Sequence, residues 1–336
     1  HLSRRLLHNP GDVTSNLLYA KESENRDRLR RARVAYERIL MADPDNAQAQ
    51  AGLARVERLL EPDSTDVAVL VGGQMQNNAA RLDDDRDPYF DLSTTAQVYI
   101  QDDRRLGDLR WATNLSGFAS LYNRFRSGDL LVASVDTGPR LGLSAAWTVR
   151  PSMQATYARL NRQDLFWSSQ GRLDFENQVG GLLSEVHLST GYEDYLAGLD
   201  YRDAWVASAG LTLAWADVGG GRLEVAPEYG HKTAAADSET YHAAAVAVSY
   251  TRAVAQDVMA IISVSGEGRQ YDETSTTGDP DRRDVELVTE LRLLKAGFFR
   301  PDLNLIGSYR FEQNFSNNGG FDYRNHTLGV DLAWTF

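Results

Sequence analysis

The stretch HTLGVDLAWTF, residues 326–336, alternates strictly between two kinds of side chain. One set is apolar and consists of Leu328, Val330, Leu332, Trp334 and Phe336. The other set is small or polar and consists of Thr327, Gly329, Asp331, Ala333 and Thr335. A period of two places successive side chains on opposite faces of a strand, so this segment predicts a β-strand with one apolar face. Which environment each face meets depends on the rest of the chain.

Composition narrows the class of protein. The 336 residues carry a formal net charge of -12, which argues against general nucleic-acid binding. Because there is no cysteine, a disulfide framework, a thiolate nucleophile or a zinc-thiolate site is excluded. No stretch approaches the roughly 18 consecutive apolar residues of a membrane helix. A transmembrane barrel stays open, since its alternating strands give only a weak hydropathy signal.

The period of two begins near residue 64 and continues to the end. Fourteen such segments start near residues 64, 89, 107, 129, 152, 171, 184, 204, 222, 239, 257, 283, 302 and 322. Their non-apolar faces carry charges repeatedly: Arg110, Arg222, Glu224, Glu228, Glu286, Glu290, Arg292, Arg310 and Glu312. Tight connections are expected at residues 104–108, 149–152, 217–221, 253–257 and 299–302. Longer polar connections are expected at residues 79–87 and 271–284.

A soluble β-sandwich or propeller is the alternative to a membrane barrel. Its strands average about five to six residues and have a buried inner face. The segments here are roughly twice that length, and a packed core would not tolerate the repeated charges, whereas a water-filled lumen would. We therefore predict an antiparallel transmembrane β-barrel of about 14 strands over residues 63–336, with those nine charged residues facing the lumen.

The final strand then has its apolar set toward lipid. Trp334 and Phe336 are expected at the membrane interface, where aromatic rings are favoured. A terminal aromatic residue on an alternating strand also resembles the targeting signal that the outer-membrane barrel assembly machinery reads. That signal often has glycine five residues before the terminal aromatic residue, and Asp331 stands there in this chain.

The first sixty residues have helical periodicity instead. Ala32, Tyr36 and Pro44 lie at the spacing of the small, aromatic and proline positions of a tetratricopeptide repeat, and Asn46 follows in the same turn. Leu53 fits the opening helix of a next unit. We predict a helical, tetratricopeptide-like segment over residues 1–62 that binds a partner. An ordinary helical hairpin is the alternative.

The sequence contains no persuasive catalytic or metal-binding pattern. The six histidines are scattered without metal-ligand spacing: His1, His8, His187, His231, His242 and His326. The run Gly219 to Gly221 closes a turn with no helix after it, so it is not a phosphate-binding loop. We expect no enzyme activity, no cofactor and no metal.

The order of a tetratricopeptide-like segment followed by a barrel resembles the surface lipoprotein assembly modifier (Slam) family. The residues that carry the resemblance are Ala32, Tyr36, Pro44 and Asn46 in the repeat, and Trp334 and Phe336 at the terminus. The resemblance implies an outer-membrane barrel with its helices in the periplasm, which helps client lipoproteins or secreted proteins reach the cell surface. The implied partners are outer-membrane lipid, lipopolysaccharide, the barrel assembly machinery and a client, with no nucleic acid.

Two other functions fit the same architecture. Exopolysaccharide export porins also place tetratricopeptide repeats before a barrel, and would conduct a polymer. A structural or scaffold barrel of an envelope complex would use the helices to dock partners.

Barrel closure brings residues 66–76 against residues 327–336. Gly72 and Gly73 would weaken pairing there, because glycine has no side chain to pack. Together with Asp331 of the last strand, they are candidates for a gate at this seam. The alternative is that the glycines relieve crowding beneath a lumen side chain.

Overall fold

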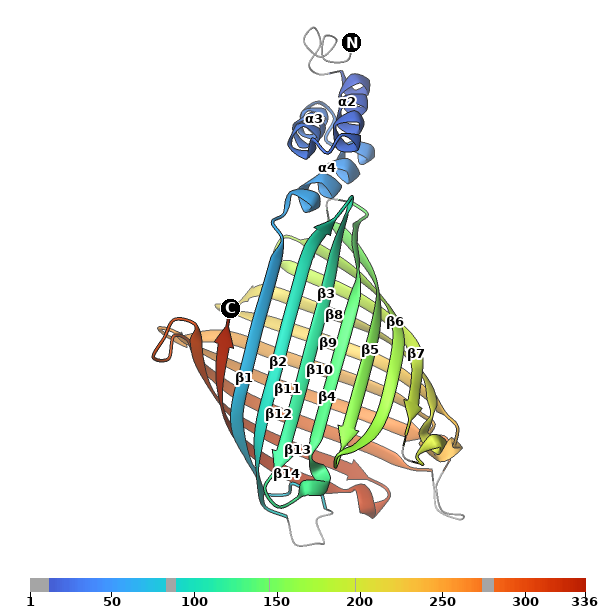
Figure 1. Ribbon diagram of the computed structural model, residues 1–336, viewed down its shortest axis with the longest axis vertical. Coiled ribbons are helices and arrows are strands. Elements are labelled where there is room, and N and C mark those ends of the chain that lie inside the picture. The colour runs from blue at the N-terminus through green and yellow to red at the C-terminus, as the bar shows by residue number, and fades with distance from the viewer. Residues whose placement is uncertain (1–11, 83–88, 145, 197, 274–280) are drawn as a thin grey trace.

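A helical arm stands on one end of a closed antiparallel β-barrel (Figure 1). The computed structural model describes residues 12–82, 89–144, 146–196, 198–273 and 281–336. Each strand pairs with its neighbours in sequence, and β1 pairs with β14 to close the ring. The predicted barrel of 14 antiparallel strands is confirmed.

The strands are as follows: β1 Ser64–Gln76, β2 Asp91–Leu106, β3 Leu109–Tyr122, β4 Leu130–Gly142, β5 Trp147–Leu160, β6 Gln163–Val179, β7 Leu182–Tyr195, β8 Ala204–Val218, β9 Gly221–Ala234, β10 Tyr241–Ala255, β11 Val258–Tyr271, β12 Arg283–Lys295, β13 Leu303–Ser316 and β14 Tyr323–Thr335.

The predicted turn at residues 149–152 is wrong, because these residues lie inside β5. Pro151 suggested a turn, but proline only removes one backbone donor from the strand. Thr137 pairs with Met153 and Leu141 pairs with Val149, so β4 and β5 keep one register on both sides of the proline. The true turn after β5 is residues 161–162, where both backbones have positive φ without any glycine. The fifth and sixth strands therefore begin earlier than predicted.

Connections differ between the two ends of the barrel. The end where β1 begins and β14 finishes has two-residue turns at residues 107–108, 180–181, 219–220 and 256–257. The opposite end has most of the longer connections, with short 3-10 helices at Arg126–Gly128, Asp200–Arg202, Asp237–Glu239 and Gly319–Phe321. Short periplasmic turns and longer outer loops are typical of outer-membrane barrels.

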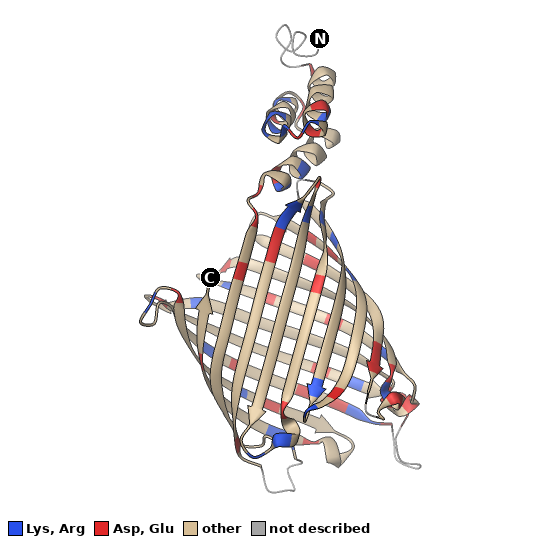
Figure 2. Ribbon diagram, in the orientation of Figure 1, with Lys and Arg blue, Asp and Glu red and all other residues tan. Residues whose placement is uncertain are grey.

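The outer surface of the barrel is apolar. On β14, Leu328 and Val330 are 50 % and 58 % exposed, while Asp331 on the opposite face is 8 % exposed. Figure 2 shows that charged positions are sparse along the middle of the front strands and gather toward their ends. An outer surface with many exposed aliphatic side chains is stable against lipid, whereas in water it would cause the protein to aggregate.

The arm consists of α2 Val13–Asn25, α3 Leu29–Ala42 and α4 Ala47–Leu60. Its core is formed by buried residues that include Ala32, Tyr36, Ile39, Ala49 and Val56. None of the described helices has the length and apolar character needed to cross a membrane. The predicted division at residues 62 and 63 falls in the connection between α4 and β1.

Candidate functional site

The seam is the place where the first strand, β1, pairs with the last strand, β14. Ala68 through Gln76 pair with Thr335 through Thr327. Beyond these pairs, Val67 and Phe336 exchange backbone hydrogen bonds of 3.2 and 2.9 Å. Residues 64–66 of β1 continue further and pair with β2 alone. At its arm-side end, β1 therefore extends beyond its pairing with β14.

Asp331 crosses this seam in the lumen. Its carboxylate lies over Gly72 of β1 and accepts a hydrogen bond of 3.2 Å from the Thr95 hydroxyl of β2. A Cβ atom on Gly72 would overlap both the Asp331 carboxylate and the Val330 carbonyl oxygen. Gly72 thus makes room for a lumen side chain, and Asp331 links β14 to β2 across β1.

Gly73 differs from its neighbour. The nearest atom to a Cβ at this position would be the Ser93 carbonyl oxygen at 3.8 Å, an ordinary contact. The two glycines are therefore not equivalent, and the close approach is confined to Gly72.

The outer end of the seam is held by the connection after β1. Asn77 and His326 exchange hydrogen bonds of 2.7 and 3.1 Å. Asn78 donates its backbone N–H to the Asn325 side chain at 3.1 Å and its side-chain amide to the Arg324 carbonyl oxygen at 2.9 Å. Arg81 reaches past β14 and pairs with Glu312 of β13 at 2.8 Å. We call residues 77–82 the outer strap, because they tie β1 to both β14 and β13.

The lumen wall carries a network of ion pairs. Strand register puts all nine charged residues predicted to face the lumen on the same face as Asp331. Their partners include Arg222 with Glu224 at 2.9 Å, Arg292 with Glu290 at 3.0 Å, and Arg310 with Glu312 at 3.4 Å. Glu286 faces Arg269 at 3.6 Å and Glu228 faces His187 at 3.7 Å. Charges of both signs on this face suit an aqueous interior.

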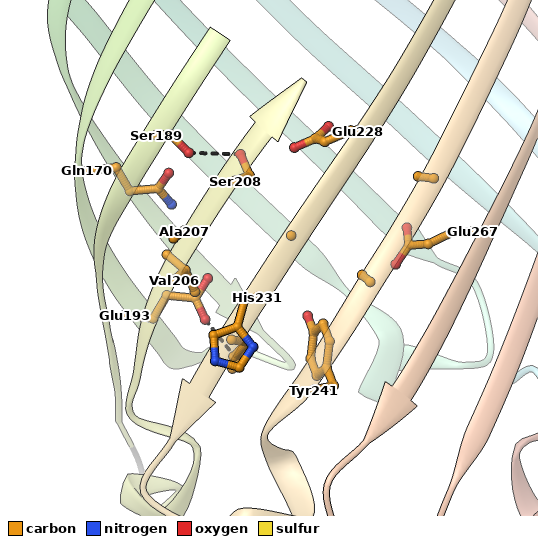
Figure 3. Close-up of a pocket in the computed structure, with 14 residues that line it drawn as sticks. Gln170, Ser189, Glu193, Val206, Ala207, Ser208, Glu228, His231, Tyr241 and Glu267 are labelled. Carbon is orange, nitrogen blue, oxygen red and sulfur yellow. Dashed lines mark hydrogen bonds and ion pairs between the residues drawn. The ribbon is translucent and has the colours of Figure 1, made fainter. Parts of the chain in front are cut away.

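A hollow of about 310 Å³ lies in this wall between β6 and β11 (Figure 3). Its floor contains the small residues Gly230, Ala243 and Ala245. Glu193 and Glu228 project beside it, and Lys232 pairs with Glu193 at 2.8 Å. Small floor residues widen the lumen here, and the carboxylates give it an acidic lining.

The arm is fastened to the barrel rim by arginines. Arg110 of β3 is 3 % exposed and does not point into open lumen; it holds the connection between α4 and β1. Its guanidinium donates to the carbonyl oxygens of Glu61 at 2.8 Å and Pro62 at 3.2 Å, and it also contacts Asp103 at 2.8 Å. The predicted lumen charge thus serves as a clamp on the chain that leads to the arm.

Arg58 of α4 makes the second attachment. It donates to the carbonyl oxygens of Ser144 and Trp147 at 3.4 and 3.3 Å, where β4 turns into β5. A Cβ on Gly142 would overlap its guanidinium, so the glycine allows this close approach. Burial, with the nearby Arg140 guanidinium, lowers the pKa of Arg58. Arg105 pairs with Asp27 and makes a third contact between barrel and arm.

The residues predicted to bind a partner through the repeat have mainly packing roles. Ala32 and Tyr36 are fully buried, so partner contact through their side chains is not available. Asn46 caps α4 by accepting the Ala49 N–H at 3.1 Å, and Leu53 packs against the arm core. Pro44 is exposed in the turn before α4.

The Tyr36 ring lies directly over Gly52, and its hydroxyl donates to Glu24. Burial, together with this carboxylate, raises the pKa of the Tyr36 hydroxyl. Glu24 also accepts two hydrogen bonds of 2.8 Å from Arg55, so one carboxylate joins all three helices. Sequence reasoning missed Glu24, Arg55 and Gly52, because their partners lie on other helices.

Trp334 and Phe336 lie at the arm-side end of β14. Phe336 is 71 % exposed, and Trp334 lies on the outward face beside Val69 and Leu303. Within the described part of the chain, no group of three or more histidine, aspartate or glutamate side chains is arranged to hold a metal ion.

The closed ring, its apolar outer surface and its charged inner wall define an outer-membrane β-barrel protein. A family model described as "surface lipoprotein assembly modifier" matches residues 184–336, from β7 to the end of the chain. This match confirms the resemblance over that region. A search among curated proteins found no match to the chain.

Solved outer-membrane proteins share the barrel only distantly. OmpT of Vibrio cholerae is 10 % identical, with 82 % of this chain and 100 % of that chain covered and a TM-score of 0.45. Pseudomonas aeruginosa OpdK, solved with vanillate, is 7 % identical, with coverages of 81 % and 99 % and a TM-score of 0.42. A BenF-like porin from Pseudomonas fluorescens is 8 % identical, with coverages of 83 % and 100 % and a TM-score of 0.42.

Proposed function

We propose that this protein assists the translocation or surface display of client lipoproteins or secreted proteins. The observation that carries the proposal is the arginine-fastened arm on the short-turn end of a barrel whose C-terminal half matches the assembly-modifier family. Short turns mark the periplasmic side, so the arm lies in the periplasm, where a client arrives. No chemical step is required.

In this proposal the arm receives the client and the barrel provides the wall along which it passes. The connection between α4 and β1 runs into the strand that forms one side of the seam. A client held on the arm is therefore delivered next to β1. The fastening by Arg110 and Arg58 keeps that delivery point constant.

The seam is the proposed gate, and its two ends differ in strength. The outer end is tied by the outer strap to β13 and β14. The periplasmic end has residues 64–66 paired on one side alone, with the Asp331–Thr95 bond as the nearest side-chain link. Opening therefore starts at the periplasmic end. The Val67–Phe336 backbone bonds at that end separate first, and release of Asp331 from Thr95 follows.

The membrane and its assembly machinery are the remaining proposed partners. The exposed outward side chains meet lipid and lipopolysaccharide, and the exposed aromatic terminus of β14 is offered to the barrel assembly machinery. Trp334 and Phe336 fit that role because an aromatic ring is stable at a membrane interface.

The test compares intact cells with and without the gene, labelled with a biotin reagent that does not cross membranes. We expect one or a few proteins to leave the labelled set while their total amounts persist inside the cell. Restoring the gene should return them to the surface. An unchanged surface protein profile would refute the proposal and favour polymer export or a scaffold role.

A further inference from the structure

One side of α3 carries basic and apolar side chains together. At 100° per residue, five positions fall within an arc of about 100°. They are Arg30, Arg31, Val34, Arg38 and Met41. We call this set the basic face of α3.

The three arginines of this face have no carboxylate partner among the described residues. Three other arginines of the arm are paired: Arg26 with Glu22 at 2.5 Å, Arg33 with Glu37 at 2.8 Å and Arg55 with Glu24 at 2.8 Å. Arg30, Arg31 and Arg38 are exposed and form no ion pair within that part of the chain. Their charge is therefore available to a partner.

Folding of α3 gives no reason for this arrangement. Arg30 and Arg31 lie in the first turn, which contains no acidic residue. The N-terminus of a helix bears partial positive charge, so cations there reduce helix stability and acidic side chains increase it. Two arginines in the unfavourable place indicate a role outside helix formation.

The apolar members of the face are unusually open to solvent. Val34 is 44 % exposed and Met41 is 83 % exposed. Methionine adapts its shape to different apolar surfaces, and arginine with methionine is enriched at protein interfaces. The face thus offers both charge and apolar area.

The position of α3 favours a partner from the periplasm over the lipid around the barrel. α4 is the helix that contacts β3 and β4, while α3 packs on α2 and α4. Figure 1 shows α3 beyond α4, away from the barrel, and Figure 2 shows several basic positions on it.

We propose that the basic face of α3 binds an extended client segment in which pairs of acidic residues alternate with pairs of apolar ones, so that one face of the segment presents both kinds. This inference rests on the proposed function and names the chemistry of the client. Carboxylates pair with Arg30, Arg31 and Arg38, and apolar side chains cover Val34 and Met41. Residues 1–60 contain eleven Lys and Arg against eight Asp and Glu, so the arm as a whole also attracts an acidic partner.

The test measures fluorescence anisotropy of a labelled synthetic peptide with the full chain in detergent micelles. The probe repeats Glu-Glu-Leu-Leu, and a matched peptide repeats Gln-Gln-Leu-Leu. We expect the Glu peptide to bind and the Gln peptide to bind about tenfold more weakly. Raising salt from about 50 to about 300 mM should weaken the Glu peptide most.

The variant Arg30→Gln with Arg31→Gln and Arg38→Gln should lose about tenfold in affinity for the Glu peptide. Arg33→Gln is the matched control, because Arg33 is paired with Glu37 outside the face. Helical circular dichroism should be unchanged in both. Equal binding of the two peptides, or of the triple variant and the parent, would overturn the inference.

The same triple variant distinguishes the client segment from two other occupants of the basic face, lipid and a second copy of the chain. If the parent binds phosphatidylglycerol vesicles and the triple variant does not, the face serves lipid and the inference fails. If the triple variant changes the sedimentation coefficient from an oligomer to a monomer, the face serves a second copy and the inference also fails. If cells without the gene lose clients from their surface but the purified protein does not bind the Glu peptide, the proposed function stands and only this inference fails.

Discussion

Gly72 and Asp331 share one small space on the lumen side of the seam. The Asp331 carboxylate occupies the volume that a Gly72 side chain would need, and it reaches Thr95 from there. A buried carboxylate is stable only with partners or water, so the hydroxyl of Thr95 and the open side of the lumen both matter. Because Gly72 has no side chain, Asp331 can link β14 to β2 across β1.

We predict that Gly72→Ala destabilises the barrel by about 1–3 kcal/mol, because the new methyl group overlaps the Val330 carbonyl as well as Asp331. Gly73→Ala is the matched control and should change stability by less than about 0.5 kcal/mol, since its methyl group meets ordinary contact distances. Urea unfolding of the protein in lipid vesicles measures both. Equal midpoints for the two variants would contradict the crowding at Gly72.

Tyr36 is the second residue with a specific prediction, which concerns pH. Because burial raises its pKa, the folded arm keeps a proton that the unfolded chain releases above the ordinary tyrosine pKa of about 10. The stability contributed by Tyr36 is therefore complete below about pH 10 and decreases as pH rises beyond it.

Helical circular dichroism during urea unfolding, between about pH 9 and 11, measures this effect. Tyr36→Phe should remove the part of the pH slope that comes from this hydroxyl. It should also cost about 1–3 kcal/mol at neutral pH, since the bond to Glu24 is lost. Tyr19→Phe is the control, because it removes the hydroxyl of another arm tyrosine that is half-buried. An unchanged slope in Tyr36→Phe would rule out this role.

The connection between α4 and β1 determines how the arm element is held. Arg110 contacts three successive residues, Glu61, Pro62 and Asp63, from inside the rim. Arg58 makes the reciprocal contact from the arm to the turn after β4. Two opposed arginine contacts fix an orientation better than one, because each limits a different rotation.

We predict that Arg110→Met releases this connection and increases cleavage of the Pro62–Asp63 bond, by a protease that cuts before aspartate, about tenfold or more. Backbone held by hydrogen bonds at its carbonyl resists a protease, and Arg110 supplies that bond at Pro62. Arg222→Met is the control, since Arg222 pairs with Glu224 on β9 away from the arm. Equal cleavage rates of the two variants would show that the clamp does not restrain the arm.

At the scale of the whole molecule, the barrel has one seam whose two ends are unequal. The outer strap joins β1 to β14 and β13, whereas the arm-side end depends on backbone pairs and on Asp331. This asymmetry gives the proposed gate a direction. It also allows a clean test, since the chain has no cysteine of its own.

We predict that a disulfide between Leu70→Cys and Ala333→Cys stops client display. These residues are direct partners across the seam on the lumen face, in a non-hydrogen-bonded pair where side chains approach closely. Surface biotin labelling should show loss of clients under oxidising conditions and recovery with reductant.

Ser116→Cys with Ser134→Cys is the matched control, because those hydroxyls are 2.7 Å apart between β3 and β4. It should crosslink without effect on display. Full display from the crosslinked seam would exclude the seam as the gate.

Much of the barrel could be predicted from sequence, because side chains still alternate between the two faces of each strand after the ring closes. Leu328 and Asp331 face opposite sides in the structure as their alternation requires, and a one-residue shift in the pairing of β14 would have exchanged its two faces. The error at Pro151 arose because a proline is equally compatible with a turn and with a strand whose ladder is interrupted. The turn at residues 161–162 was missed because its positive φ angles belong to Asn161 and Arg162, not to glycine.

The sequence by itself determined the two periodicities, the strand number, the polar face and the position where helix gives way to strand. These features depend on residues a few positions apart in the chain, so they can be recognised from the sequence alone. The tertiary structure alone decided that Arg110 clamps the arm, that Arg58 rests on Gly142, and that Asp331 passes over Gly72 to reach Thr95. Those partners are far apart in the chain, and they meet only because closing the ring fixes the distance between strands and the direction of every side chain.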